Sequence, residues 1–431
     1  MNLKLPRVRL GSRARTHLAN RRQLREPSGF RIAIADRVAQ LDPEQWDDVV
    51  DGESWFFSRD YLAMLEHVPP AVVEPRYALI SDEQGPVAVV VLQWAEVDGT
   101  RLRPLKKDAK DGDDELNPLR RLVDKLSRPA RAAFATRLRE RVLVCGNLLT
   151  YGQHAVAVAP DVDPDTVWPA VAEVLYRVRR AEKLAGQAGF VLIKDIPVDD
   201  NEGVAQLQGL GYRGIETEPN MMLAIDPAWK THADYLAGMA SKYRSAVKNQ
   251  ILLPIEKAGL AVRAFAPAGA LGRRAHELYL GVHENAALRP FTLHPDYFEA
   301  LAAAGGERVR FTGLFAGPHD TPEALHGFIV TLADVDEALG YHIGFAQREG
   351  EDLPLYLRLL HASVADAIAL RAHALSFGRT ALEPKSRLGA KPREMQVWLR
   401  HRQPVFNQIV KRLVGFAHHA DAPDTNPFKK G

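Results

Sequence analysis

Three ionisable side chains lie close together near the C-terminal end of the chain. Arg379, Glu383 and Lys385 fall within seven positions, directly after the apolar segment 374–378. Cations that follow a buried strand are well placed to hold an anion, and a carboxylate whose pKa burial raises toward neutrality accepts a proton. Amide formation from an activated acyl donor requires both functions. The spacing therefore predicts a charged turn that serves acyl transfer to an amine.

Glu383 has three possible roles in such a turn. If the carboxylate is buried, its pKa is raised and Glu383 can act as a general base for the attacking amine. A salt bridge to Arg379 or Lys385 lowers its pKa and makes it an orienting residue instead. Full exposure makes it an ordinary surface acid. Arg379 and Lys385 are likewise either substrate anchors or members of a surface turn.

The residues before this turn predict the strands and the helix that position it. An apolar strand over 338–345 leads into a short acidic loop, a long helix over 353–373 and a second strand over 374–378. Tyr341 and His342 are candidate catalytic residues on the first strand, where side-chain alternation predicts that only one of them faces inward. The turn after the second strand then presents its charges beside the first strand.

A second group of candidates lies on a predicted helix from Tyr235 to Ile255. It contains the substrate-binding candidates Lys242, Tyr243, Arg244 and Lys248. Arg244 and Lys248 are four residues apart and share one helix face, which is either a solvated basic face or an anchor for a phosphate or carboxylate.

A third candidate, Arg289, belongs to a polar cluster with His283, Glu284 and His294. It serves either acceptor recognition or helix-end polarity. The cluster lacks the paired spacing of a metal site, and we expect no metal.

Composition excludes several classes of protein. With 431 residues the chain is long enough for two domains, and a hydrophobic fraction of 46% is ordinary for a globular protein. No apolar run approaches the roughly 18 to 20 residues of a membrane span, and no secretion signal opens the chain. Cys145 is the single cysteine and lies in an apolar run, so we expect a core residue in a cytoplasmic protein.

The order of predicted strands and helices divides the chain into four parts. Residues 1–29 form a basic leader, with eight Lys or Arg residues against one acid, that is either a disordered segment or an arm for RNA or an anionic surface. An N-terminal domain spans 30–228, with a charge-rich insertion at 101–141. A C-terminal domain spans 229–415, and 416–431 is a tail. Each domain repeats one plan of antiparallel strands, a helix and two further strands, so the fold class is α/β (α+β) with mixed sheets flanked by helices.

These features together resemble a known family. The run from Lys242 to Asn249, the strand–helix–strand of 341–378 and the Glu383-Pro384-Lys385 segment are similar to tandem GNAT-fold N-acyltransferases. That group includes bacterial acyltransferases and the Fem-type peptidoglycan aminoacyltransferases, and the resemblance covers about 30–415. It implies two GNAT-like domains, each a mixed, mostly antiparallel sheet flanked by helices. The related pattern is Glu-His-Lys, and Pro384 replaces its histidine here.

The donor is not fixed by this resemblance. GNAT enzymes that use coenzyme A hold its pyrophosphate on a glycine-containing loop at a helix N-terminus. The corresponding segments here, 160–165 and 347–352, are acidic and do not match that pattern. Acyl-CoA, another acyl thioester and aminoacyl-tRNA therefore all stay open as donors.

The sequence thus predicts a cytoplasmic N-acyltransferase in which an amine attacks the donor carbonyl directly, with no covalent acyl-enzyme. The acceptor is a small-molecule or peptide amine, tRNA is a possible partner, and neither DNA binding nor a membrane span is expected. Two alternatives stay open. One is an aminoacyl-tRNA-dependent aminoacyltransferase, and the other is a catalytically inactive GNAT-like binding module.

Overall fold

The computed structural model describes residues 27–98, 139–181, 188–285, 291–347, 352–403, 423 and 425–429. The predicted insertion at 101–141 lies almost entirely outside these residues, as does most of the basic leader. Within them the sequence builds two runs of elements, here called the N-terminal half (through β7) and the C-terminal half (from α7). In the described residues no helix is long and apolar enough to cross a membrane.

The N-terminal half begins with short helices whose ends are set by the sequence. Asp42 caps its first α-helix by accepting a hydrogen bond from the Gln45 amide at 3.1 Å, with Pro43 at the first helical position. The elements of this half are β1 (Arg31–Ala35), α2 (Pro43–Val50), α3 (Arg59–His67), β2 (Val73–Ser81), β3 (Pro86–Asp98), β4 (Arg139–Cys145), β5 (Val156–Val158), α5 (Pro164–Ala181), β6 (Ala188–Pro197), α6 (Glu202–Ala205) and β7 (Arg213–Ala224).

The C-terminal half repeats much of this order. Its elements are α7 (His232–Gly238), α8 (Ser241–Val247), the π-helical turn η6 (Lys248–Leu252), α9 (Leu253–Lys257), β8 (Leu260–Ala264), α10 (Gly269–His283), α11 (Tyr297–Gly305), β9 (Val309–Ala316), β10 (Leu325–Asp334), β11 (Glu337–Phe345), α12 (Leu355–Ala369), β12 (Ala374–Ser376), α13 (Leu382–Arg387) and β13 (Lys391–His401).

The described strands join into one 13-stranded sheet in the order β1-β2-β3-β4-β6-β13-β7-β12-β11-β10-β9-β8, with β5 beside β3. Each half has one parallel pair, β4 with β6 and β11 with β12, and the remaining pairs are antiparallel. A helix, α5 or α12, connects the two strands of each parallel pair, as parallel neighbours require. The predicted fold class, mixed and mostly antiparallel sheets flanked by helices, is confirmed.

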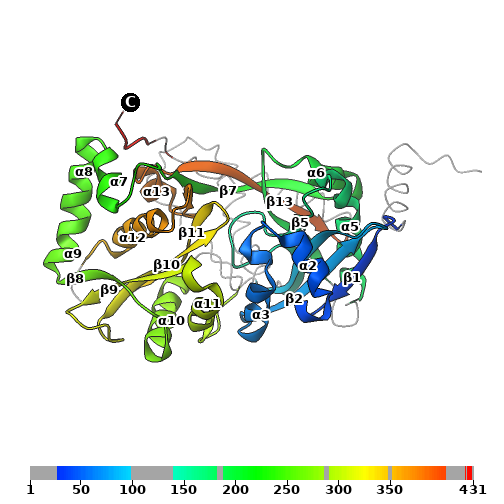
Figure 1. The fold of residues 1–431 in the computed structure, drawn as a ribbon, viewed down its shortest axis with the longest axis horizontal. Coiled ribbons are helices and arrows are strands. Elements are labelled where there is room, and N and C mark those ends of the chain that lie inside the picture. The colour runs from blue at the N-terminus through cyan, green and yellow to red at the C-terminus, as the bar shows by residue number, and fades with distance from the viewer. Residues whose placement is uncertain are drawn as a thin grey trace, which may run out of the picture.

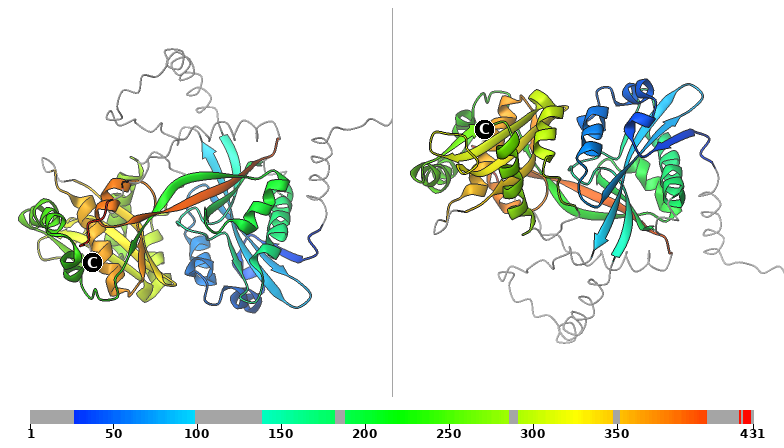
Figure 2. Two further views of the ribbon diagram at one scale, coloured as in Figure 1. Left: turned by 90° about the horizontal axis from the view of Figure 1, so that it is seen from above. Right: turned by 90° about the horizontal axis from the view of Figure 1, so that it is seen from below.

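The last strands of the two halves are exchanged. β7 of the N-terminal half pairs with β12 of the C-terminal half, whereas β13 pairs with β6 of the N-terminal half. β7 and β13 also pair with each other from Arg213↔Leu399 to Met222↔Lys391, and in Figures 1 and 2 they run as two long ribbons between the ends of the molecule. The sequence predicts a domain boundary at 228/229. That boundary stays a prediction, and the sheet runs continuously on both sides of it.

Three sequence expectations about local structure are wrong. The sequence predicts a hairpin over 211–225, but the structure has the single strand β7, in which Pro219 is tolerated because the ladder to β13 is bulged there. The sequence also predicts a strand over 151–158, but most of this segment is a loop and only β5 is a strand. The expected helix from Tyr235 to Ile255 breaks at Met239, whose backbone is extended, and continues as α8, η6 and α9.

An aromatic cluster packs the two halves together. Trp46, Phe56 and Tyr61 of the N-terminal half belong to the same buried cluster as Tyr297 and Tyr341 of the C-terminal half. Burying side chains of this size contributes about 1.5–3 kcal/mol each. This interface places residues from both halves around β11.

A buried carboxylate adds a polar clamp to the same interface. Asp334 at the end of β10 accepts hydrogen bonds of 2.7 Å from both the Ser54 hydroxyl and the Trp55 amide, and His154 lies 3.5 Å away. Burial alone would raise the pKa of Asp334, but these contacts outweigh it and the pKa is lowered. Asp334 is therefore ionised when the two halves are packed.

A histidine pair ties α7 to α12 and predicts an acid-sensitive fold. His232 Nε2 and His361 Nδ1 are 3.1 Å apart, and His361 is 1% exposed. Burial lowers the pKa of His361 well below its usual value and that of His232 to about 4. In the unfolded chain the two histidines have a pKa of about 6.5. Below that pH they bind protons in the unfolded chain but not in the folded chain, so the free energy of unfolding falls as pH falls.

We expect His361→Asn, which keeps a side-chain hydrogen-bonding group, to reduce this acid sensitivity. Between pH 7 and pH 5 the unfolding free energy of the variant should fall by about 2 kcal/mol less than that of the wild type, because the unfolded variant binds one proton fewer. Urea unfolding at the two pH values measures the difference, and the exposed His319→Asn is the control. Equal losses in wild type and His361→Asn would contradict the prediction.

Candidate active site

The two strands β11 and β12 part shortly after they meet. They pair in parallel only from Glu337–Leu339 to Ala374–Ser376, whereas β11 continues to Phe345 along β10. Beyond Leu339 the β12-facing edge of β11 therefore has no strand partner. Unpaired main-chain N–H groups inside a protein need a partner, and a carbonyl oxygen of a bound substrate is one. The order of strand, helix and strand over 338–378 predicts such a parting, and the pairing confirms it.

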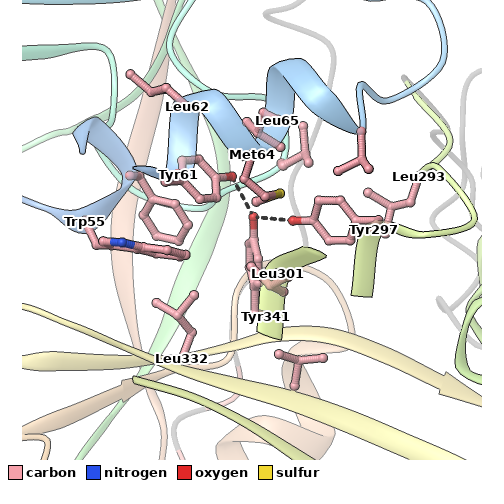
Figure 3. Packing of buried hydrophobic residues seen from close by; sticks show 14 of the residues in the cluster. Trp55, Tyr61, Leu62, Met64, Leu65, Leu293, Tyr297, Leu301, Leu332 and Tyr341 are labelled. Carbon is pink, nitrogen blue, oxygen red and sulfur yellow. Dashed lines mark hydrogen bonds between the residues drawn. The ribbon is translucent and has the colours of Figure 1, made fainter. Parts of the chain in front are cut away.

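Tyr341 lies on β11 at a bulge, where the register to β10 shifts between Val330 and Thr331. Its hydroxyl is 2.9 Å from that of Tyr61 and accepts a hydrogen bond of 3.1 Å from Tyr297 (Figure 3). Asn147 donates to the Tyr61 hydroxyl at 2.9 Å, so the chain of hydrogen bonds continues into the N-terminal half. Burial raises the pKa of Tyr341 well above its usual value, and its phenol is protonated at neutral pH.

His342 reaches the same tyrosine cluster. Its Nε2 is 3.3 Å from the Tyr297 hydroxyl, and its ring centroid lies 4.1 Å from that of Tyr341. Alternation predicted that only one of Tyr341 and His342 faces inward, and that expectation is wrong because the bulge interrupts the alternation. Burial lowers the pKa of His342 to about 3, so the ring is neutral and is a hydrogen-bonding group rather than a cation.

The predicted charged turn is partly a helix. Thr380 and Ala381 both have positive φ, of 64° and 48°, and the six-residue helix α13 follows them. Two consecutive residues in this sparsely populated region cost energy, and such strain persists only where surrounding contacts hold it. In the described residues those contacts come from Arg379 and Lys385.

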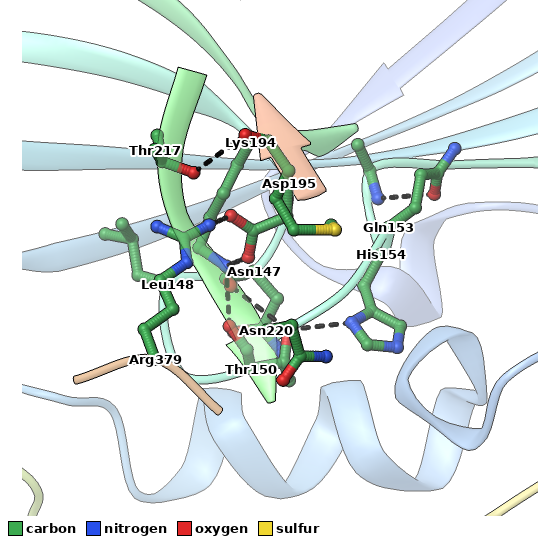
Figure 4. Close-up of polar contacts among 12 residues, drawn as sticks. Asn147, Leu148, Thr150, Gln153, His154, Lys194, Asp195, Thr217, Asn220 and Arg379 are labelled. Carbon is green, nitrogen blue, oxygen red and sulfur yellow. Dashed lines mark hydrogen bonds and ion pairs between the residues drawn. The ribbon is translucent and has the colours of Figure 1, made fainter. Parts of the chain in front are cut away.

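Arg379 forms an ion pair with Asp195 of β6, and Lys194 contacts the same carboxylate (Figure 4). Asp195 is fully buried and has a φ of 56°, at a bulge in the ladder from β6 to β13. Lys194 Nζ also donates to the Thr150 carbonyl at 2.5 Å, and burial holds the pKa of Lys194 well below its usual value, with Arg379 lowering it further. The exchanged strands thus bring Arg379 of one half onto β6 of the other.

Lys385 is 3% exposed and has no carboxylate within ion-pair distance in the described residues. Its Nζ donates to the main-chain carbonyls of Gly378, at 3.1 Å, and Arg379, at 2.5 Å, where β12 ends. Burial lowers the pKa of Lys385 to about 7, against a smaller opposite influence of Glu218. A neutral amine has two N–H donors and one lone pair, so two carbonyl partners leave the lone pair available.

Glu383 does not join these residues. Its side chain is 61% exposed and pairs with Arg387 one helical turn away at 2.5 Å. The salt bridge weighed for it with Arg379 or Lys385 is not formed, because α13 directs Glu383 and Lys385 to different sides. Of the three roles considered for Glu383, the exposed surface acid agrees with this position.

The other predicted binding residues that the structure describes lie on α8 and η6. On α8 and η6, Lys242 and Lys248 are exposed, Tyr243 packs against the apolar core and Arg244 donates to the Met239 carbonyl at 3.0 Å. In the part of the chain described here, no hydrogen bond or ion pair connects any of them to Arg379 or Lys385. Arg289 lies outside the described residues. Anchoring of a donor or acceptor by these residues stays a prediction.

Sequence reasoning missed Lys194, Asp195 and Tyr61. The first two were visible as a charged pair inside the apolar strand 190–197, which is unusual for a buried strand. Cys145 is buried with a raised pKa, in agreement with a core role. Within the described ranges no group of three or more His, Cys, Asp or Glu side chains is arranged to hold a metal ion.

No protein-family model and no curated protein match this sequence. Solved structures show similarity over most of the chain. A crystal structure of FemX has a TM-score of 0.49 at 13% identity and covers 86% of this chain and 98% of its own. A tandem GNAT protein from the clavulanic acid biosynthesis pathway has a TM-score of 0.48 at 12% identity, with 87% and 99% covered.

A third similar structure is the C-terminal domain of a putative lysylphosphatidylglycerol synthetase from Agrobacterium fabrum. It has a TM-score of 0.44 at 11% identity and covers 86% of this chain and 96% of its own. The topology of the present chain has in each half antiparallel strands, a connecting helix and a parallel strand. That arrangement agrees with the order of antiparallel strands, helix and further strands that the sequence predicts for each domain.

Proposed function

We propose that this protein is an N-acyltransferase that joins an activated acyl or aminoacyl donor to an amine by direct attack. One observation carries the proposal. The edge of β11 has no strand partner beyond the end of β12, and just after β12 Lys385 Nζ donates to the carbonyls of Gly378 and Arg379. An edge that can bind a carbonyl oxygen and a side chain that can accept a proton thus both follow the paired part of β11 and β12.

The β11 edge would bind the donor carbonyl. Main-chain N–H groups between Ile343 and Phe345 would stabilise the negative charge that develops on the oxygen during attack. One donor of this kind is worth about 3 kcal/mol in the transition state. Tyr341 and His342 would hold the bulged strand in place through their hydrogen bonds to Tyr297, and in this proposal they are positioning residues.

Lys385 would accept the proton of the attacking amine. In its neutral form the lone pair is free while both N–H groups remain bonded to carbonyls, so proton uptake requires no rearrangement of the turn. A proton acceptor works best when its pKa is near the working pH. Arg379 is already paired with Asp195, so its proposed role is to hold the turn.

A donor panel tests the proposal. The purified full chain is incubated with a mixture of primary amines and with either acetyl-coenzyme A or alanyl-tRNA, and new amides are detected by mass spectrometry. We expect amide formation from one of the two donors. RNase sensitivity identifies the tRNA-dependent alternative. Binding of a donor without any amide product would favour the inactive binding module instead.

A further inference from the structure

The loop between β4 and β5 extends from the N-terminal half to the parting of β11 and β12. β4 ends at Cys145, and residues 147–154 form a loop before β5 resumes pairing with β3. Tyr151 lies in this loop, and its ring packs against Gly378, where an added Cβ would come within 2.9 Å of the ring. Gly378 is the residue whose carbonyl accepts from Lys385. The N-terminal half thus contributes a wall at the proposed reaction site.

The surroundings of Tyr151 come from both halves. Lys194 Nζ of β6 lies 6.0 Å from the centre of its ring, and Arg379 and Glu218 are its charged neighbours. Tyr151 also raises the pKa values of Tyr279 of α10 and Tyr356 of α12, in addition to the larger effect of burial. The Tyr151 ring therefore lies beside Lys194 of β6 and against Gly378, which follows β12.

The hydroxyl of Tyr151 is chemically available. No residue of the described chain forms a hydrogen bond with it. Burial raises the pKa of Tyr151 further than Arg379 lowers it, so the phenol keeps its proton at neutral pH. A protonated phenol in a partly dry site, without a protein acceptor, donates to whatever polar group enters.

The corresponding place in the N-terminal half is filled. β4 and β6 also part, after Cys145 and Ile193, but Lys194 occupies the parting and binds the Thr150 carbonyl, and Arg379 of the other half closes it from outside. The two partings are therefore not equivalent, since one contains an internal ion cluster and the other borders a phenol without a partner.

We propose that Tyr151 completes the donor site of the C-terminal half, with its hydroxyl donating a hydrogen bond to an oxygen of the bound acyl donor. The inference rests on the proposed function. It assigns to each chain one donor site that is formed by residues of both halves. The N-terminal half then participates in recognition of the donor, although the reacting edge belongs to the C-terminal half.

Photocrosslinking tests the contact without requiring turnover. Tyr151 is replaced by p-azidophenylalanine, and the protein is irradiated with acetyl-coenzyme A or with alanyl-tRNA. Tyr176 of α5, whose hydroxyl accepts from Arg180 at 2.8 Å, carries the same replacement as the control position. We expect an adduct with one donor at position 151 and none at position 176. No adduct with either donor, or equal adducts at both positions, would overturn the inference.

Tyr151→Phe provides a second measurement if the larger side chain disturbs folding. Loss of one hydrogen bond should weaken donor binding about tenfold, measured by titration calorimetry, with an unchanged thermal midpoint. Unchanged affinity would count against the proposal. An adduct without amide formation by the wild type would support the donor site while rejecting the transferase function. Amide formation without an adduct would support the transferase function and reject the contact of Tyr151 with the donor.

Discussion

Replacing Lys385 with glutamine is expected to lower kcat by about 100-fold or more, the usual effect of removing a proton acceptor. Glutamine retains two N–H donors for the carbonyls of Gly378 and Arg379, so the turn should keep its shape. In the wild type, activity should rise with pH through about 7 as Lys385 loses its proton, since only the neutral amine accepts another. That limb of the profile should be absent from the variant.

The measurement is a pH profile of kcat with the donor that the panel identifies. Lys385→Met removes the hydrogen bonds as well as the base, and a comparison of the two variants separates catalysis from support of the turn. The Gly378 carbonyl would still accept from the Met221 amide at 3.1 Å. Lys257→Met changes an exposed lysine on α9 and should behave as the wild type. A profile that keeps its midpoint near pH 7 in Lys385→Gln would exclude Lys385 as the proton acceptor.

Replacing Asp195 with asparagine should destabilise the whole fold by about 3–5 kcal/mol, because it leaves the Arg379 guanidinium without its counter-ion in a buried site. That loss is a large part of the 5–15 kcal/mol typical of a folded protein. The second change Arg379→Met should recover part of the loss, because it removes the stranded charge. Equilibrium urea unfolding of the two single variants and the double variant measures the coupling.

An exposed ion pair provides the matched control. Asp47 and Arg59 are 2.6 Å apart with side chains 50% and 40% exposed, and Asp47→Asn should cost no more than about 1 kcal/mol. A cost of that size for Asp195→Asn would show that the ion pair across the halves contributes little. If the losses of unfolding free energy in the two single variants add up to the loss in the double variant, the two side chains are not coupled.

Local sequence patterns predicted most of the elements correctly. The sequence predicts a helix over 59–67, which is observed as α3, and the strands around Arg31, Val87 and Val309 form where alternation and turn residues indicate. These features depend on neighbours within a few positions. The parting of β11 and β12 was likewise predictable, because an apolar strand, a helix and another strand follow one another directly along the chain.

Contacts between distant segments were not predictable in the same way. The exchange of β7 and β13 leaves both strands with ordinary strand composition, so nothing in either segment indicates its partner. The bulge at Tyr341 shifts the alternation of side chains by one position. The expectation for His342, which assumed regular alternation, was therefore wrong. Asp195 and Arg379 meet only because of the exchanged strands, and Glu383 is exposed because α13 replaces the expected turn.

The exchange of β7 and β13 has a consequence for how the molecule denatures. Neither half can lose its sheet while the other stays intact, since each contributes the strand that completes its neighbour. A chain cut between the halves would yield two fragments that each lack a central strand and expose two unpaired edges, which favours aggregation. Duplicated units that ordinarily melt one by one are here joined into a single cooperative unit.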